Sequence, residues 1–195
     1  MNPLAGQLQG YFRHLGSIAD GVLASDARGG IATDAAVQDF LQRAEATKRD
    51  RLRIFFIGNG GSAGICSHMA TDWMKNGGFH ALALNDPAVL TCLSNDLGYE
   101  RVFAKQIEMH GRAGDLLIAI SSSGNSPNIV AGVAAARDAG MQVVTLSGFK
   151  PDNRLRQLGD VNFYVPDMSY GFVEIAHLAI CHAVLDLSMG WRAGS

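Results

Sequence analysis

The chain has 195 residues, of which 48% are hydrophobic and 17% charged, with 23 glycines and a formal net charge of −2. This length fits one domain with a full hydrophobic core. The slightly negative charge excludes the basic surface that nucleic acids or anionic membranes attract. The first residues do not read as a signal peptide, and the apolar runs fall short of the roughly 20 residues of a membrane span. We therefore expect a cytoplasmic protein without nucleic-acid or membrane partners.

The cysteines support this compartment. Cys66, Cys92 and Cys181 are odd in number, widely spaced and without a CxxC pair. This usage is typical of reducing surroundings, with neither a disulfide framework nor a cysteine zinc site.

The first 50 residues predict a helical arm. From Leu4 to Leu23, apolar residues recur at three- and four-residue spacing, as on one face of a helix. Gly29-Gly30 interrupts the pattern, and a second helix is expected from about Thr33-Asp34, which can cap it, to just before residues 48–51. We expect the arm to pack on the core or on a second subunit, so that residues 1–195 form a single domain.

Beyond the arm, short apolar runs alternate with helical patterns, and Gly-, Asn- and Ser-rich turns separate them. The expected strands cover residues 53–57, 81–84, 116–120, 142–146 and 161–165. The expected helices cover residues 62–75, 88–94, 99–110, 127–139 and 170–189. This alternation predicts right-handed crossovers and a parallel sheet with helices on both faces.

Two polar turns follow expected strands. Gly58-Asn59-Gly60-Gly61-Ser62 exposes backbone N–H groups at a helix start, which suits an anion, although a tight turn without a ligand explains the glycines equally well. Residues 121–126 offer four serine hydroxyls at a second helix start, more than N-capping requires. Both turns are expected at the same sheet edge, where the carboxyl ends of parallel strands lie and ligands bind. Because of its additional hydroxyls, the serine turn is the stronger candidate for a phosphate site there.

Polar side chains also interrupt two helices. His68 and Asp72 are four residues apart and share a helix face, which an exposed polar surface also explains. Glu174 and His182 lie about two turns apart in an otherwise apolar helix. Because buried charges need partners, these residues predict either a satisfied polar network or a metal or catalytic cluster. His177 is expected to be structural, and His110 to be exposed or capping.

Together, the two turns and the segment Asn95-Asp96-Leu97-Gly98 resemble the sugar isomerase (SIS) domain, in particular the bacterial phosphoheptose isomerases. The resemblance extends over nearly the whole chain. It implies a flavodoxin-like five-stranded parallel sheet, a homotetramer whose active sites combine residues of neighbouring subunits, and a phosphosugar ligand.

The resemblance also implies a set of site residues. It implies that His68, Asp72, Glu174 and His182 bind one zinc ion per subunit and carry out the acid–base chemistry. The catalytic candidates are Asp72, Glu174 and His182. The implied substrate contacts are Asn59, Gly60, Gly61, Asn95, Asp96, Ser121, Ser122, Ser123 and Ser126. Among these, Asn59 and Asp96 are expected to contact sugar hydroxyls.

Two positions depart from the family pattern. Asp72 stands where the family usually has Glu, and Glu174 where it usually has Gln. Two carboxylates facing one site raise each other's pKa unless a cation neutralises them. We therefore expect the metal to be retained, and either Asp72 or Glu174 to act as the base, since the substitutions allow this role to pass to Glu174.

The implied activity is isomerisation of sedoheptulose 7-phosphate to a heptose 7-phosphate, for nucleotide-activated heptose synthesis. Two alternatives remain open at this point. One is isomerisation of another phosphosugar, and the other is a non-catalytic SIS protein that binds a phosphosugar or a protein partner.

Overall fold

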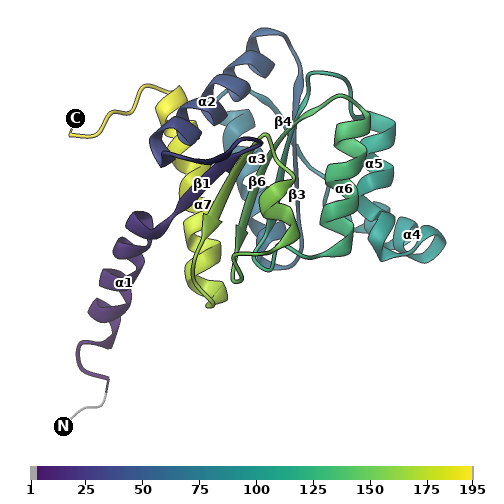
Figure 1. Cartoon of the computed structure of the whole chain (residues 1–195). Coiled ribbons are helices and arrows are strands. Elements are labelled where there is room, and N and C mark those ends of the chain that lie inside the picture. Colours follow the sequence, from purple (N-terminus) through teal and green to yellow (C-terminus); the bar gives the residue numbers. More distant parts are fainter. Residues whose placement is uncertain (1–3, 195) are drawn as a thin grey trace.

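The computed structural model describes residues 4–194, and Figure 1 shows their arrangement. The helices of this range are α1 Gln7–Gly21, α2 Thr33–Arg49, α3 Gly61–Lys75, α4 Pro87–Leu97, α5 Val102–His110, α6 Pro127–Asp138 and α7 Tyr170–Ser188. The strands are β1 Leu23–Asp26, β2 Gly29–Ile31, β3 Arg53–Gly58, β4 His80–Ala83, β5 Leu116–Ser121, β6 Gln142–Gly148 and β7 Val161–Val165. Two short 3-10 helices, η1 Tyr99–Arg101 and η2 Arg154–Gln157, complete the described elements.

All strands join one mixed sheet in the order β2-β1-β7-β6-β5-β3-β4. The five strands predicted from the sequence, β3 to β7, pair in parallel, and their spatial order β4-β3-β5-β6-β7 is that of flavodoxin-like folds. The order reverses between β3 and β5. This reversal is the topological switch point, where such sheets bind ligands.

The expectation of a five-stranded, wholly parallel sheet is wrong. A hairpin of β1 and β2 lies within the first 50 residues, and β1 pairs antiparallel with β7, with Leu23 opposite Tyr164. The arm is therefore two helices joined by a hairpin that extends the sheet. The hairpin strands are only four and three residues long, and Gly29-Gly30 forms part of β2 rather than a break between helices.

Side chains of the central strands alternate between two cores. Ile54 and Phe56 of β3 join a core with α2, α3 and α7, whereas Phe55 and Ile57 join a core with α5 and α6 on the opposite face. This alternation follows from the two-residue period of a strand. Both faces of the sheet are therefore covered, as predicted.

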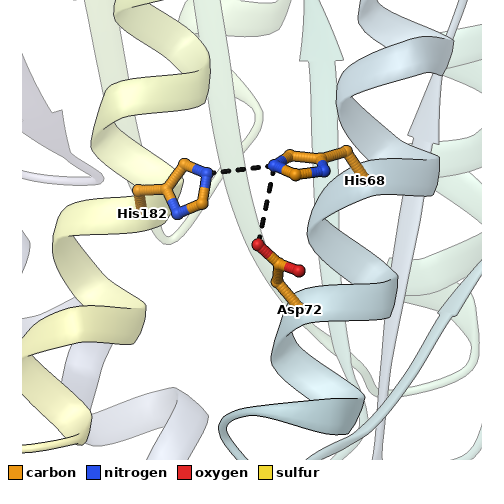
Figure 2. Close-up of side chains that lie close together, drawn as sticks. All are labelled: His68, Asp72 and His182. Atoms are coloured by element: carbon orange, nitrogen blue, oxygen red, sulfur yellow. Dashed lines mark hydrogen bonds and ion pairs between the residues drawn. The ribbon is translucent and has the colours of Figure 1, made fainter.

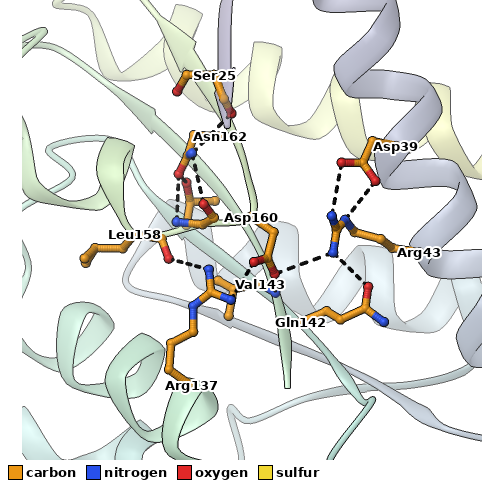
Figure 3. A network of polar contacts seen from close by, with 11 residues as sticks. Ser25, Asp39, Arg43, Arg137, Gln142, Val143, Leu158, Asp160 and Asn162 are labelled. Atoms are coloured by element: carbon orange, nitrogen blue, oxygen red, sulfur yellow. Dashed lines mark hydrogen bonds and ion pairs between the residues drawn. The ribbon is translucent and has the colours of Figure 1, made fainter. Parts of the chain in front are cut away.

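A polar network at the start of β7 connects the two helix layers to the sheet (Figure 3). Asp160 lies before β7 and accepts a hydrogen bond of 2.6 Å from Arg137 of α6, while Arg43 of α2 lies 3.6 Å from its other carboxylate oxygen. The same carboxylate accepts a bond of 2.7 Å from the backbone N–H of Val143. One carboxylate thus connects helices from opposite faces.

Two helices leave apolar surface uncovered in the isolated chain. Helix α1 projects away from the body in Figure 1, with Leu8 64% and Phe12 63% exposed. Helix α7 contacts α3 and α2 but leaves Ile175 40% exposed. Helix α7 is also long and apolar enough to cross a membrane, with a mean hydropathy of 1.4. This corrects the expectation that no segment has the length and hydropathy of a membrane span. One such helix is weak evidence for a span, because core helices of other proteins share these properties.

Candidate active site

The two polar turns meet at the switch point of the sheet. The glycine turn follows β3 and the serine turn follows β5, and these neighbouring strands pair up to Gly58 opposite Ile120. Both turns lead directly into helices, α3 and α6, whose N-termini carry partial positive charge. The sequence prediction that the turns share one sheet edge is confirmed.

The turns enclose a single pocket together with the start of α7. The pocket is lined by Asn59, Gly60, Gly61, Ser62, Ser121, Ser122, Ser123, Ser126, Tyr170 and Glu174. Eight of these ten residues belong to the two turns, so the pocket wall is mainly backbone and hydroxyl groups. Ser62 lies at the end of the glycine turn, but neither it nor Tyr170 was predicted as a site residue; Tyr170 joins the pocket because α7 begins there.

The glycine turn needs residues without side chains. Gly60 has φ of 54° and ψ of −121°, a conformation that strains residues with a Cβ. A Cβ on Gly58 would lie 2.8 Å from atoms of Ser62, where α3 turns back over the strand. The glycines therefore allow α3 to begin close against β3, and the turn acts as a wall of the pocket.

The serine turn carries more hydroxyls than its helix uses. Ser126 is the N-cap residue of α6 but makes no side-chain cap hydrogen bond. Its Oγ lies 3.3 Å from the Oγ of Ser121, which lies 3.5 Å from that of Ser123. Ser122 is 5% exposed, and its Oγ has no hydrogen-bond partner among the described residues. A buried hydroxyl without a partner is costly, so this turn is suited to an anion that accepts hydrogen bonds.

Glu174 reaches the same pocket from the first turns of α7. A Cβ on Gly61 would overlap the Glu174 carboxylate, so this carboxylate lies directly against the start of α3. The positive end of the α3 dipole favours a carboxylate at that position. Glu174 therefore faces the two turns.

A second group of polar side chains lies between α3 and α7 (Figure 2). The Nε2 of His68 is 3.2 Å from the Nε2 of His182 and 3.5 Å from the Oδ2 of Asp72. One ligand atom from each residue lies within 4.8 Å of the others. Imidazole nitrogen and carboxylate oxygen are the donor types that zinc and related divalent ions prefer. These three residues fit a divalent metal ion.

Glu174 does not belong to this group. It precedes His182 by eight residues, so a rise of about 1.5 Å per residue separates the two backbone positions by about 12 Å along α7. The family resemblance implied one metal and acid–base centre formed by all four residues. Within one chain, Glu174 lies at the pocket and the His/Asp/His group lies farther along α7.

Asn95 and Asp96 lie apart from the pocket lining. Both are on α4, in which no residue is buried, and the Nδ2 of Asn95 donates to the Oδ1 of Asp96 over 2.8 Å. Their predicted contact with substrate therefore needs a movement of α4 or another subunit, and it stays a prediction.

His177 and His110 lie as expected. His177 is fully buried, its Nε2–H donates to the carbonyl of Ser147 over 3.0 Å, and burial lowers its pKa to about 4. His110 is exposed at the C-terminal end of α5. A neutral, hydrogen-bonded His177 is a structural residue.

Residues 34–148 match the SIS domain family model. A phosphoheptose isomerase of Edwardsiella ictaluri is 37% identical over 78% of this chain and 81% of its own length. That of Serratia proteamaculans is 36% identical over 84% of this chain and 90% of its own length. A solved structure of phosphoheptose isomerase from Neisseria gonorrhoeae superposes with a TM-score of 0.84 at 28% identity, over 96% of this chain and all of the other. The chain belongs to the SIS domain family, among the phosphoheptose isomerases.

Proposed function

We propose that this chain is a phosphosugar isomerase that converts sedoheptulose 7-phosphate to a heptose 7-phosphate. The observation that carries the proposal is the pocket at the switch point, where a turn with surplus serine hydroxyls faces a glycine wall and a carboxylate. The phosphoheptose isomerases to which the chain is similar act on such a substrate. The product would feed nucleotide-activated heptose synthesis.

The serine turn would hold the phosphate. Its hydroxyls and the N-terminal N–H groups of α6 can donate to phosphate oxygens without a lysine or arginine. Ser121, Ser122, Ser123 and Ser126 are the proposed contacts. Asn59, Gly60 and Gly61 would lie beside the sugar carbons, with Asn95 and Asp96 completing the contacts in the assembled enzyme.

The reaction moves one proton between adjacent carbons. A carboxylate removes a proton from C1 of the ketose, the C1=C2 double bond forms, and an acid gives a proton to the C2 oxygen. The resulting enediol then loses the C1 hydroxyl proton and takes up a proton at C2, which leaves an aldehyde at C1. Glu174 and Asp72 are the candidate bases, and His182 is the candidate acid.

A divalent ion, with zinc as our proposal, would be held by His68, Asp72 and His182, with Glu174 as a fourth ligand in the assembled enzyme. When bound, such an ion polarises the substrate oxygens and stabilises negative charge on them. The described chain supplies the matching donor set, two imidazole nitrogens and one carboxylate. Asp72 used as a ligand would be less free to act as the base, which favours Glu174 in that role.

We further propose a homotetramer in the cytoplasm. The exposed apolar residues of α1 and α7 supply surface for such an assembly. Subunit contact could also bring the His/Asp/His group of one chain to the pocket of another. This would join the two centres that one chain holds apart.

A turnover assay with two matched variants tests this proposal. Metal-loaded protein is expected to convert sedoheptulose 7-phosphate, and Glu174→Gln to reduce kcat by about 100-fold or more if Glu174 is the base. Asp72→Asn would then retain more activity than Glu174→Gln. The opposite ranking would return the role of base to Asp72.

Metal analysis provides the second test. Protein purified without chelator is expected to carry a divalent ion, and a His68→Ala/His182→Ala variant to lose it. Absence of any bound divalent ion, together with turnover that no added metal increases, would contradict the metal proposal.

A further inference from the structure

A buried asparagine outside the pocket lining contacts the glycine turn. Asn128, in the first turn of α6, is only 2% exposed. Its side-chain amide forms a reciprocal pair with that of Asn59. Each Nδ2 donates to the other's Oδ1, over 2.9 Å from Asn59 and 2.8 Å from Asn128. This pair is a direct link between the glycine turn and the helix that follows the serine turn.

A backbone N–H group next to the pair determines which end of each amide is oxygen and which is nitrogen. The backbone N–H of Ile129 donates to the Oδ1 of Asn128 over 3.0 Å. The same N–H also donates to the carbonyl of Ser126 over 3.1 Å. Because a backbone N–H can only donate, the oxygen of the Asn128 amide, and not its NH2 group, faces it. The Nδ2 of Asn128 then faces the Oδ1 of Asn59, which determines the orientation of the second amide.

Tyr99 reinforces the same orientation. Its hydroxyl donates to the Oδ1 of Asn59 over 3.0 Å, from η1 beyond the end of α4. The Asn59 oxygen therefore accepts two hydrogen bonds, one for each lone pair. The Asn59 nitrogen uses one N–H for Asn128, and no described residue accepts its second N–H.

We propose that Asn128 and Tyr99 are positioning residues that orient the Asn59 amide so that it presents an N–H donor, and not an oxygen acceptor, to the ligand. Asn59 lines the pocket, so its free N–H is available to a sugar oxygen. Such a donor stabilises an oxygen that gains negative charge as the enediol forms. The substrate in this inference rests on the proposed function, whereas the orientation of Asn59 does not.

A double-mutant cycle tests whether the two residues act through Asn59. Asn128→Ala is expected to lower kcat/KM by about tenfold, mostly in kcat, because it removes both hydrogen bonds of the reciprocal pair with Asn59. Tyr99→Phe removes one hydrogen bond to Asn59 and is expected to lower kcat/KM by about threefold. In an Asn59→Ala background, each of these changes is expected to have less than about a twofold effect. Full multiplication of the effects in the double variants would overturn the inference. Tyr99 is 52% exposed, so its variant is informative even if Asn128→Ala folds poorly.

Asn162 provides a matched control. It is also 2% exposed and fully hydrogen-bonded, accepting from Thr145 over 2.7 Å, but it does not line the pocket. Asn162→Ala is expected to lower stability and to change kcat/KM by the same factor with or without Asn59. Coupling of Asn162 to Asn59 as strong as that of Asn128 would contradict a specific positioning role.

A measurement without substrate separates this inference from the proposed activity. In protein labelled with 15N-asparagine, one side-chain N–H proton of Asn59 is expected to exchange slowly with water and the other quickly, and Asn128→Ala should make both exchange quickly. A protein without turnover but with this pattern would refute the proposed activity and support the orientation. Equally fast exchange of both protons in the unaltered protein would overturn the orientation.

Discussion

Ser122 is the residue whose environment points most directly to an anion. Its buried hydroxyl lines the pocket without a partner, so removing it costs the folded protein little. We expect Ser122→Ala to raise the KM for a phosphosugar, or the Kd for inorganic phosphate, by about five- to tenfold, with a melting temperature that stays the same or rises. Titration calorimetry and thermal unfolding measure both quantities.

Ser147 is the matched control for this prediction. It is 0% exposed and its Oγ also lacks a partner, but it is absent from the pocket lining. Ser147→Ala should leave the phosphate affinity unchanged. An equal loss of affinity in both variants would show that the effect of Ser122 is not a direct contact.

His177 predicts how the stability depends on pH. Burial lowers its pKa to about 4 from 6.5, so the unfolded chain takes up a proton between these values while the folded protein does not. The neutral histidine therefore costs nothing above about pH 6.5 and lowers the free energy of unfolding by about 2 kcal/mol at pH 5. The variant His177→Gln keeps an N–H donor for Ser147 but cannot titrate. Between about pH 7 and pH 5, its free energy of unfolding, measured with denaturant, should fall by about 2 kcal/mol less than that of the original protein. Identical losses in both proteins would contradict this assignment.

At the scale of elements, the start of α3 and the first turns of α7 are in contact at the pocket. Gly61→Ala would place a methyl group where the Glu174 carboxylate lies, and the carboxylate would have to move. We expect kcat to fall by about tenfold or more without loss of stability, because alanine favours a helix over glycine. Steady-state kinetics and thermal unfolding of the purified variant measure these effects.

Gly64 on the same helix provides the control. Nothing lies within 4 Å of a Cβ built there. Gly64→Ala should raise the free energy of unfolding by about 0.5–1 kcal/mol and leave kcat unchanged. If Gly61→Ala is equally active, Glu174 does not act from the position that the structure gives it.

The elements also show what a sequence can predict. A long apolar run predicts a buried strand, because helices cover both faces of a parallel sheet. Strand β5, Leu116–Ser121, follows this rule and is buried throughout. The β1–β2 hairpin could not be predicted in this way. Its strands are short, and β1 is stabilised by pairing with β7, more than 130 residues later in the chain.

Part of the site could also be predicted from the sequence. The turns could be located because both follow buried strands of one parallel sheet. Helical spacing placed His68 beside Asp72, but it could not show that the Glu174 carboxylate lies at the pocket, apart from His182, in one chain, since that depends on how α7 packs on α3. Asn128 gave no signal because its role depends on a contact across 69 positions of sequence.

At the scale of the whole molecule, the exposed apolar face of α1 predicts self-association. Leu8 and Phe12 are both more than 60% exposed, and such surface is unfavourable in water. A Leu8→Glu/Phe12→Glu variant is expected to dissociate the proposed tetramer, as measured by analytical ultracentrifugation. Met109→Glu, at a residue 67% exposed near the end of α5, should leave the assembly intact. A tetramer that survives the α1 changes would remove α1 from the interface.

The most direct test of the proposed isomerisation is the conversion of sedoheptulose 7-phosphate by the zinc-loaded protein in deuterated water, followed by NMR. If the protonated base exchanges with the solvent before the enediol is protonated at C2, the heptose 7-phosphate carries deuterium at C2, and this is the expected result. We also expect this conversion to be lost in Glu174→Gln and in the His68→Ala/His182→Ala variant. No conversion by the zinc-loaded protein, or a product without deuterium formed equally by all variants, would contradict the proposed isomerisation.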